Sequence, residues 1–134
     1  MTTHPPVPAG TETTFRKTMT VAEQAFFTGI SGNLATLHVD ARAASASGFD
    51  APLCFELAVA SLATTCLNRL AGPGWRIGAL NLVFPSPATV GTTIAASAAV
   101  VDATDRAIEC QVTCTADERG VVVTGRATLV PVND

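Results

Sequence analysis

The sequence predicts an α+β fold in which an antiparallel sheet is wrapped around one long central helix. Residues 53–63 are apolar at nearly every position except Glu56 and Ser61, and a helix that is apolar all round must be surrounded by protein. From residue 75 onwards, apolar and polar side chains alternate instead, as they do in half-buried antiparallel strands. One further strand is predicted before the helix. A sheet that curves around the helix is the simplest way to bury it.

The N-terminal part of the chain predicts an arm and one strand. Residues 1–12 are rich in Thr and Pro and show no periodicity, so we expect a flexible arm before a single domain over residues 13–134. Residues 14–21 predict a strand, because their apolar members share one parity. These members are Phe15, Met19 and Val21.

Two short helical segments are expected next. Thr20 and Glu23 have the spacing of a capping box, in which each side chain binds a backbone amide of the other residue. The helix that follows should end at Gly29 and Gly32. After a loop, an Ala- and Ser-rich stretch over residues 41–47 predicts a second helical turn.

The central helix is expected to begin near Asp50, a suitable N-cap, with Pro52 close to its first turn. It should run to about Leu70 and end at the Ala-Gly-Pro-Gly sequence of residues 71–74. Four strands should follow as an antiparallel meander, with tight turns such as residues 117–120. Their predicted ranges are 75–84, 92–101, 108–116 and 121–129.

The composition excludes several classes of protein. Hydrophobic residues make up 48% of the 134 residues and charged ones 14%, which is not the composition of a disordered tail. The net charge is −3, and the single lysine, Lys17, belongs to no basic cluster, so no nucleic-acid partner is expected. No apolar stretch reaches about 18 residues, so no membrane span is expected. The N-terminus lacks the features of a secretory signal, which predicts a cytoplasmic location.

The four cysteines predict neither a metal site nor a redox pair. They form no Cys-x-x-Cys pair and have no His at zinc spacing. We therefore expect buried free thiols and no bound metal. The cysteines are Cys54, Cys66, Cys110 and Cys114.

Four segments of the chain occur in an order and spacing that resemble one known family. They cover residues 27–40, 49–62, 82–94 and 125–130. The first resembles the hydratase motif of the MaoC-like dehydratases, the (R)-specific enoyl-CoA hydratases of the hotdog fold. The others resemble the start of the family's central helix, its strand with a Pro and Gly corner, and its final strand. The resemblance implies that the predicted α+β fold is a hotdog.

The resemblance also implies a reaction, in which water is added across an enoyl thioester or removed in the reverse direction. In the family, an Asp and a His five residues apart hold one water, a Gly at the helix start donates its amide, and a helical Ser helps to hold the active-site loop. His38 matches the His and Ser61 matches the Ser, whereas Asn33 stands in place of the Asp. Phe55 and Glu56 replace a His-Gly pair at the helix start.

Candidate residues and partners follow from this match. The catalytic candidates are His38 and Asn33, and those for substrate binding are Phe55, Glu56, Leu57 and Ser61. The expected substrate is an acyl thioester, either enoyl-CoA or enoyl-ACP. No cofactor is expected beyond the CoA or carrier-protein pantetheine that the substrate itself carries. Because the sheet would keep an exposed edge, we also expect a homodimer, or a heteromer with a second hotdog subunit.

Asn33 leaves three functions open. An amide can orient a water but cannot accept its proton, so acid–base catalysis would fall on His38 or on a carboxylate elsewhere. The first hypothesis is a hydratase or dehydratase that retains this chemistry. The second is a catalytically impaired acyl-binding subunit of a heteromeric dehydratase. The third is a hotdog acyl-CoA thioesterase, with Glu56 as base or nucleophile.

Each candidate also has a purely structural interpretation. Asn33 suits a turn after Gly32, and a carboxylate such as Glu56 is favoured in a first turn by the helix dipole. Ser61 is small enough to allow close packing. Whether His38, Asn33 and Glu56 face one cavity distinguishes the functional interpretation from the structural one.

Overall fold

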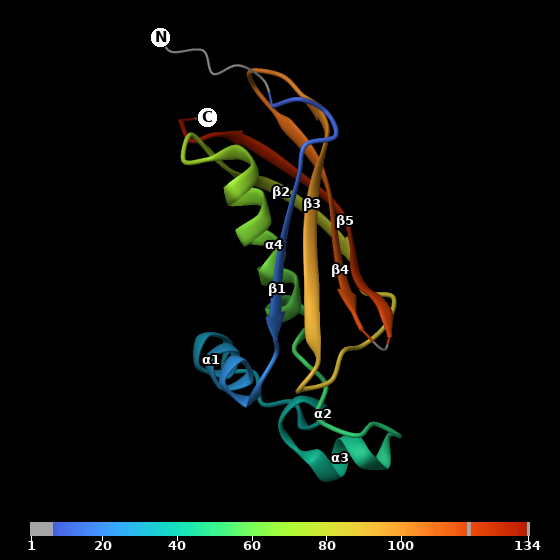
Figure 1. Cartoon of the computed structure of the whole chain (residues 1–134). Helices are drawn as coiled ribbons and strands as arrows, with labels where there is room; N and C mark the ends of the chain where they lie inside the picture. Colours follow the sequence, from blue (N-terminus) through green and yellow to red (C-terminus); the bar gives the residue numbers. More distant parts are fainter. Residues whose placement is uncertain (1–6, 118, 134) are drawn as a thin grey trace.

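The computed structural model describes residues 7–117 and 119–133, which form a five-stranded antiparallel sheet wrapped around the long helix α4 (Figure 1). Three shorter helices gather at the end of the sheet where β1 ends (Figure 1). The strands are β1 (Glu12–Thr18), β2 (Trp75–Val83), β3 (Thr93–Ala103), β4 (Ile108–Ala116) and β5 (Gly120–Pro131). The helices are α1 (Val21–Ser31), α2 (Thr36–Val39), α3 (Ala41–Ala46) and α4 (Glu56–Ala71). The predicted α+β architecture is confirmed.

The core lies between α4 and the sheet. Apolar side chains of α4, such as Val59 and Leu67, are buried against the strands. Along β4, every second residue from Ile108 to Ala116 is buried, because successive strand residues point to opposite faces. The cysteines are free and buried within this core, as predicted; they are Cys54, Cys66, Cys110 and Cys114. Within the described residues, no helix is long and apolar enough to cross a membrane.

Helix α4 begins at Glu56, so the prediction that it begins near Asp50 is wrong. Residues 52–54 form a short antiparallel contact with residues 88–90, through two backbone hydrogen bonds of 2.8 and 2.9 Å. These bonds hold the chain extended ahead of the helix. The N-cap position is therefore occupied by Phe55, whose side chain caps no amide.

The sheet order differs in one respect from a simple meander. Strands β3, β4 and β5 follow one another as neighbours, but β2 pairs with β5 at the far edge, giving the order β1-β3-β4-β5-β2. The chain between β2 and β3 must therefore cross from one side of the sheet to the other. Residues 84–92 make this crossing, and part of it reaches the start of α4.

The N-terminal helices follow the predicted signals closely. The Thr20–Glu23 capping box is present at the start of α1. The helix ends at Gly32, whose φ of 73° is a conformation that glycine adopts readily, while Gly29 lies inside it. The short helix α2 forms within the expected loop. The Ala-rich turn is present as α3, with Asp40 as its N-cap.

Two segments near the N-terminus complete the fold. Strand β1 ends at Thr18 rather than at residue 21, since the helix begins there. Of the predicted arm, residues 1–6 lie outside the described residues. Gly10 and Thr11 each make a backbone hydrogen bond of 2.8 Å to Val100 of β3.

Candidate functional site

His38 lies on α2 with its ring held from two sides. Its Nδ1 atom is 2.8 Å from the backbone oxygen of Leu53. Because a carbonyl oxygen only accepts hydrogen bonds, Nδ1 must carry the proton, and the neutral ring keeps its lone pair on Nε2. The ring also stacks on Phe55, with 4.4 Å between centroids and an interplanar angle of 23°. His38 thus presents Nε2 as the atom free to exchange protons.

Gln24 of α1 holds the backbone around His38. Gln24 is 6% exposed, and among the described residues it is the one polar residue that is buried. Its Nε2 donates to the backbone oxygens of His38 and Leu53 at 2.8 and 3.0 Å. Its Oε1 accepts from the amide of Phe55 at 3.1 Å. One side chain therefore connects α1, α2 and the residues that precede α4.

Sequence reasoning missed Gln24. The sequence does contain a signal for it. Gln24 lies three positions before Phe27 in α1, so the two residues share the face of the helix that packs inward. A buried amide at such a position needs partners for both its donors and its acceptor.

Glu56 faces His38 from the first turn of α4. One carboxylate oxygen, Oε1, is 3.7 Å from Nε2 of His38. The His38 side chain is 12% exposed and that of Glu56 is 50% exposed, so the pair lies at the boundary between core and solvent. The positive end of the α4 dipole favours a carboxylate at this position.

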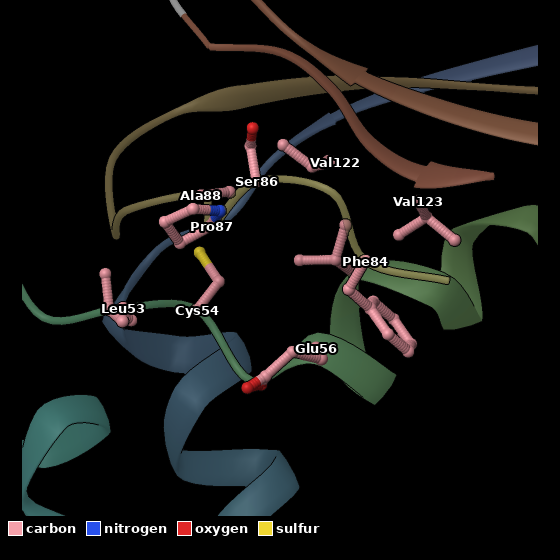
Figure 2. Close-up of a pocket in the computed structure, with 10 residues that line it drawn as sticks. Leu53, Cys54, Glu56, Phe84, Ser86, Pro87, Ala88, Val122 and Val123 are labelled. Atoms are coloured by element: carbon pink, nitrogen blue, oxygen red, sulfur yellow. The ribbon is translucent and has the colours of Figure 1, made fainter. Parts of the chain in front are cut away.

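Glu56 also lines a cavity of about 310 Å³ beside the start of α4 (Figure 2). The wall is mostly apolar and is built from the segment before α4, the crossing connection after β2, and β5. The lining residues are Leu53, Cys54, Glu56, Val59, Phe84, Ser86, Pro87, Ala88, Val122 and Val123. A mostly apolar cavity with one carboxylate at its rim is suited to an organic ligand with an apolar part.

The thiol of Cys54 forms part of this wall (Figure 2). Burial, together with the nearby carboxylates of Glu23 and Glu56, raises the pKa of this thiol to about 11. The thiol is therefore protonated near neutral pH and contributes an apolar surface rather than a nucleophile.

Asn33, Leu57 and Ser61 lie elsewhere. The Oδ1 atom of exposed Asn33 accepts a hydrogen bond from the amide of Ala35 at 2.9 Å, which is a turn contact. Leu57 is 61% exposed. Ser61 is exposed and donates to the backbone oxygen of Ala58 within α4 at 2.6 Å. Of the predicted site residues, the structure brings together His38, Phe55 and Glu56.

The start of α4 leaves backbone amides for a ligand. The amide of Phe55 is bound by Gln24, but the Phe55 side chain caps no amide of the first turn. The amide of Glu56 therefore lies at the positive end of the helix, next to the cavity. Among the described residues, no cluster of three or more His, Cys, Asp or Glu side chains is arranged to hold a metal ion.

Comparison with solved structures shows the same fold. The (R)-hydratase from A. caviae involved in PHA biosynthesis is 24% identical, with a TM-score of 0.87 over 92% of this chain and 96% of that one. The HadBC (3R-hydroxyacyl-ACP dehydratase) complex from Mycobacterium tuberculosis is 18% identical, with a TM-score of 0.75 over 91% and 96% of the two chains. A hot-dog-like protein from Thermanaerovibrio acidaminovorans is 13% identical, with a TM-score of 0.67 over 94% and 85%. The predicted hotdog fold is confirmed.

Sequence comparison identifies the family. No curated protein matches the chain. A family model described as the MaoC like domain matches residues 6–122, which include both His38 of α2 and Glu56 of α4. The match spans most of the chain, so the family predicted from the four sequence segments is confirmed. This chain belongs to the MaoC-like domain family.

Proposed function

We propose that this chain is a hydratase or dehydratase of acyl thioesters, acting on an enoyl-CoA or an enoyl-ACP, with His38 as a proton-transferring residue. The observation that carries the proposal is the fixed His38 ring. Its Nδ1 is bound to Leu53 and its Nε2 faces Glu56, which lines the apolar cavity. Family membership and the A. caviae fold match support the same reaction class.

The proposed hydration requires proton transfer to and from the substrate, and it requires stabilisation of a negative charge on the thioester oxygen. Water attacks the β-carbon while a base takes its proton, and an acid then protonates the α-carbon. Between these events the thioester oxygen carries negative charge. The amide of Glu56 and the positive end of α4 provide stabilisation for that oxygen. The apolar cavity wall receives the acyl chain, and the CoA or pantetheine arm enters as part of the substrate.

An assay of purified full-length chain with trans-2-enoyl-CoA substrates of increasing chain length tests the proposal. The wild-type chain should consume the conjugated double bond and form a 3-hydroxyacyl thioester. His38→Gln should lower kcat at least about 100-fold, because acid–base residues contribute about 10² to 10⁴. His4→Gln, in the other histidine, is the control and should keep the wild-type rate. Absence of hydration with every CoA and carrier-protein substrate would exclude the proposal.

A second candidate is the catalytically impaired acyl-binding subunit. The observation in its favour is Asn33, an amide in the place of the family's Asp, which is engaged in a turn with Ala35. The structurally similar HadBC is itself a complex. This candidate predicts that the isolated chain is inactive, and that activity depends on mixing with a second hotdog protein whose motif is intact. A gain of activity in Asn33→Asp alone would also favour it.

We also propose that the chain works as a homodimer or pairs with a second hotdog subunit. Strand β2 lies at the edge of the sheet, and its neighbourhood exposes the apolar side chains of Leu80, Val83 and Phe84. Phe84 also lines the cavity. An unpaired apolar edge is usually covered in the assembled protein. A partner that covers Phe84 would therefore also contact the wall of the cavity.

A further inference from the structure

We propose that Glu56 is the carboxylate that works with His38, so that the catalytic pair is formed between α2 and α4 rather than within the motif loop. This inference rests on the proposed hydration of an acyl thioester. It assigns to a residue of the helix the proton transfer that the family's loop Asp performs and that Asn33 cannot perform.

The distance between the two groups allows one water to bind both of them. Two atoms 3.7 Å apart, as Nε2 of His38 and Oε1 of Glu56 are, can both lie about 2.8 Å from one water oxygen. Nδ1 is committed to Leu53, so the ring can turn only Nε2 towards such a water. The cavity that Glu56 lines opens beside this position.

The other titratable groups around the pair are engaged elsewhere. Glu23 of α1 binds Thr20 and lies 3.2 Å from the Lys17 ammonium group. Asp40, which follows α2, caps α3 through the amide of Arg42 at 2.8 Å. Cys54 is a buried, protonated thiol. Glu56 is thus the carboxylate that reaches both His38 and the cavity.

The proposed step adds one water to the double bond and regenerates both side chains. The Glu56 carboxylate takes a proton from water as the water oxygen bonds to the β-carbon, and the electrons of the double bond move towards the thioester oxygen. Glu56 passes this proton to Nε2 of His38, which holds its lone pair in the neutral ring. The imidazolium that forms then gives its Nε2 proton to the α-carbon, which restores the thioester carbonyl. Glu56 is again a carboxylate and His38 is again neutral, so the net change is the addition of one water.

This order of events also resolves an apparent conflict at the helix start. A carboxylate beside a developing enolate would oppose its negative charge. Glu56, however, gains a proton from water while that charge develops. The repulsion therefore falls as the enolate forms, and the helix end can stabilise the thioester oxygen.

The test compares Glu56→Gln with the matched control Glu12→Gln, an exposed glutamate at the start of β1. Glu56→Gln should lower kcat for enoyl-CoA hydration about 10²- to 10³-fold, with KM within about threefold. Glu12→Gln should match wild type. Added formate should partly restore the rate of Glu56→Ala, which a purely structural role would not allow.

The outcomes separate this inference from the proposed function. Hydration by wild type that persists within threefold in Glu56→Gln, while His38→Gln is inactive, overturns the role of Glu56 and leaves the hydratase intact. The assay also monitors free CoA. Release of CoA that depends on Glu56, without hydration, overturns both and identifies a thioesterase. Melting curves of each variant show whether a lost rate reflects lost folding.

Discussion

Gln24 satisfies three backbone groups with one buried side chain. Both hydrogens of its amide nitrogen bind carbonyl oxygens, those of His38 and Leu53, and its oxygen binds the amide of Phe55. Since Leu53 also accepts from the His38 ring, the Gln24 side chain fixes the atom that orients the catalytic candidate. It is a positioning residue rather than a catalytic one.

Replacing Gln24 by Leu should lower the free energy of unfolding by about 2–3 kcal/mol, because buried polar groups would lose their partners. Gln24→Glu should also be destabilised at pH 7, since a carboxylate would face two carbonyl oxygens. It should regain stability at lower pH, where a protonated carboxyl can donate again. Urea unfolding of both variants at pH 5 and pH 7 measures these effects. A Gln24→Leu midpoint equal to that of wild type would contradict the assigned contacts.

The buried thiols should be unreactive in the folded chain. Burial raises the pKa of Cys110 to about 11 and of Cys114 to about 12, and it also raises the pKa of Cys66. Because the thiolate is the reactive form, a thiol-specific reagent should label the native chain slowly at pH 7 and label all four cysteines rapidly in denaturant. Fast labelling of native chain at the same pH would show that the core opens readily.

Helix α4 shows what local signals can and cannot predict. Its apolar composition correctly predicted a buried helix, and the glycines correctly predicted its end. Its start was misplaced because Asp50 and Pro52 form a good local start signal. Tertiary contacts with residues 88–90 hold this segment extended instead. Ahead of helix α1, backbone hydrogen bonds join Met19 to residues 91 and 92 but leave Thr20 free to cap, and there the capping box predicted the true start.

The capping box of α1 should make stability depend on pH. The hydrogen bond from Thr20, followed by the Lys17 ammonium group, lowers the pKa of Glu23 from 4.5 to about 2. A lowered pKa stabilises the fold above the unfolded value and loses that contribution as pH falls towards the folded value. The difference in melting temperature between wild type and Glu23→Gln should therefore be constant above about pH 5.5 and vanish near pH 2.

Asp50→Ala is the matched control for this experiment, since Asp50 is exposed and caps no helix. It should leave the melting temperature nearly unchanged at both ends of the pH range. If the difference in melting temperature between wild type and Glu23→Gln stayed constant down to pH 2, that result would contradict the lowered pKa of Glu23.

The α+β architecture was predictable because periodicity reports burial, and burial fixes which elements surround the helix. The strand order was not, because the alternation along β2 does not distinguish β3 from β5 as its partner. For the site, family resemblance located His38 and the start of α4. The shared contacts of Gln24 and Leu53 were not predictable, because they join α1, α2 and α4 through backbone atoms.

The exposed edge at β2 should pair with a second subunit. Leu80 lies in the middle of β2 and is 48% exposed, so Leu80→Lys should place a charge in the interface and produce monomers. Thr14→Lys, on the opposite edge strand β1, is the control and should remain dimeric. Sedimentation velocity at micromolar concentrations measures the mass. A wild-type chain that is monomeric throughout this range would contradict pairing of two identical copies. The mass of a mixture with another hotdog protein would then test pairing with a different subunit.

The backbone and the side chain of Leu53 have separate roles at the site. Its carbonyl oxygen orients His38, whereas its side chain lines the cavity. Any residue supplies a carbonyl oxygen, so mutation at position 53 can reshape the cavity while the histidine stays in place. Under the proposed function, a substitution of Leu53 would change the preference for the acyl chain and leave the orientation of His38 unchanged. The contact that orients the histidine does not depend on the side chain at position 53, because it is made by a backbone oxygen.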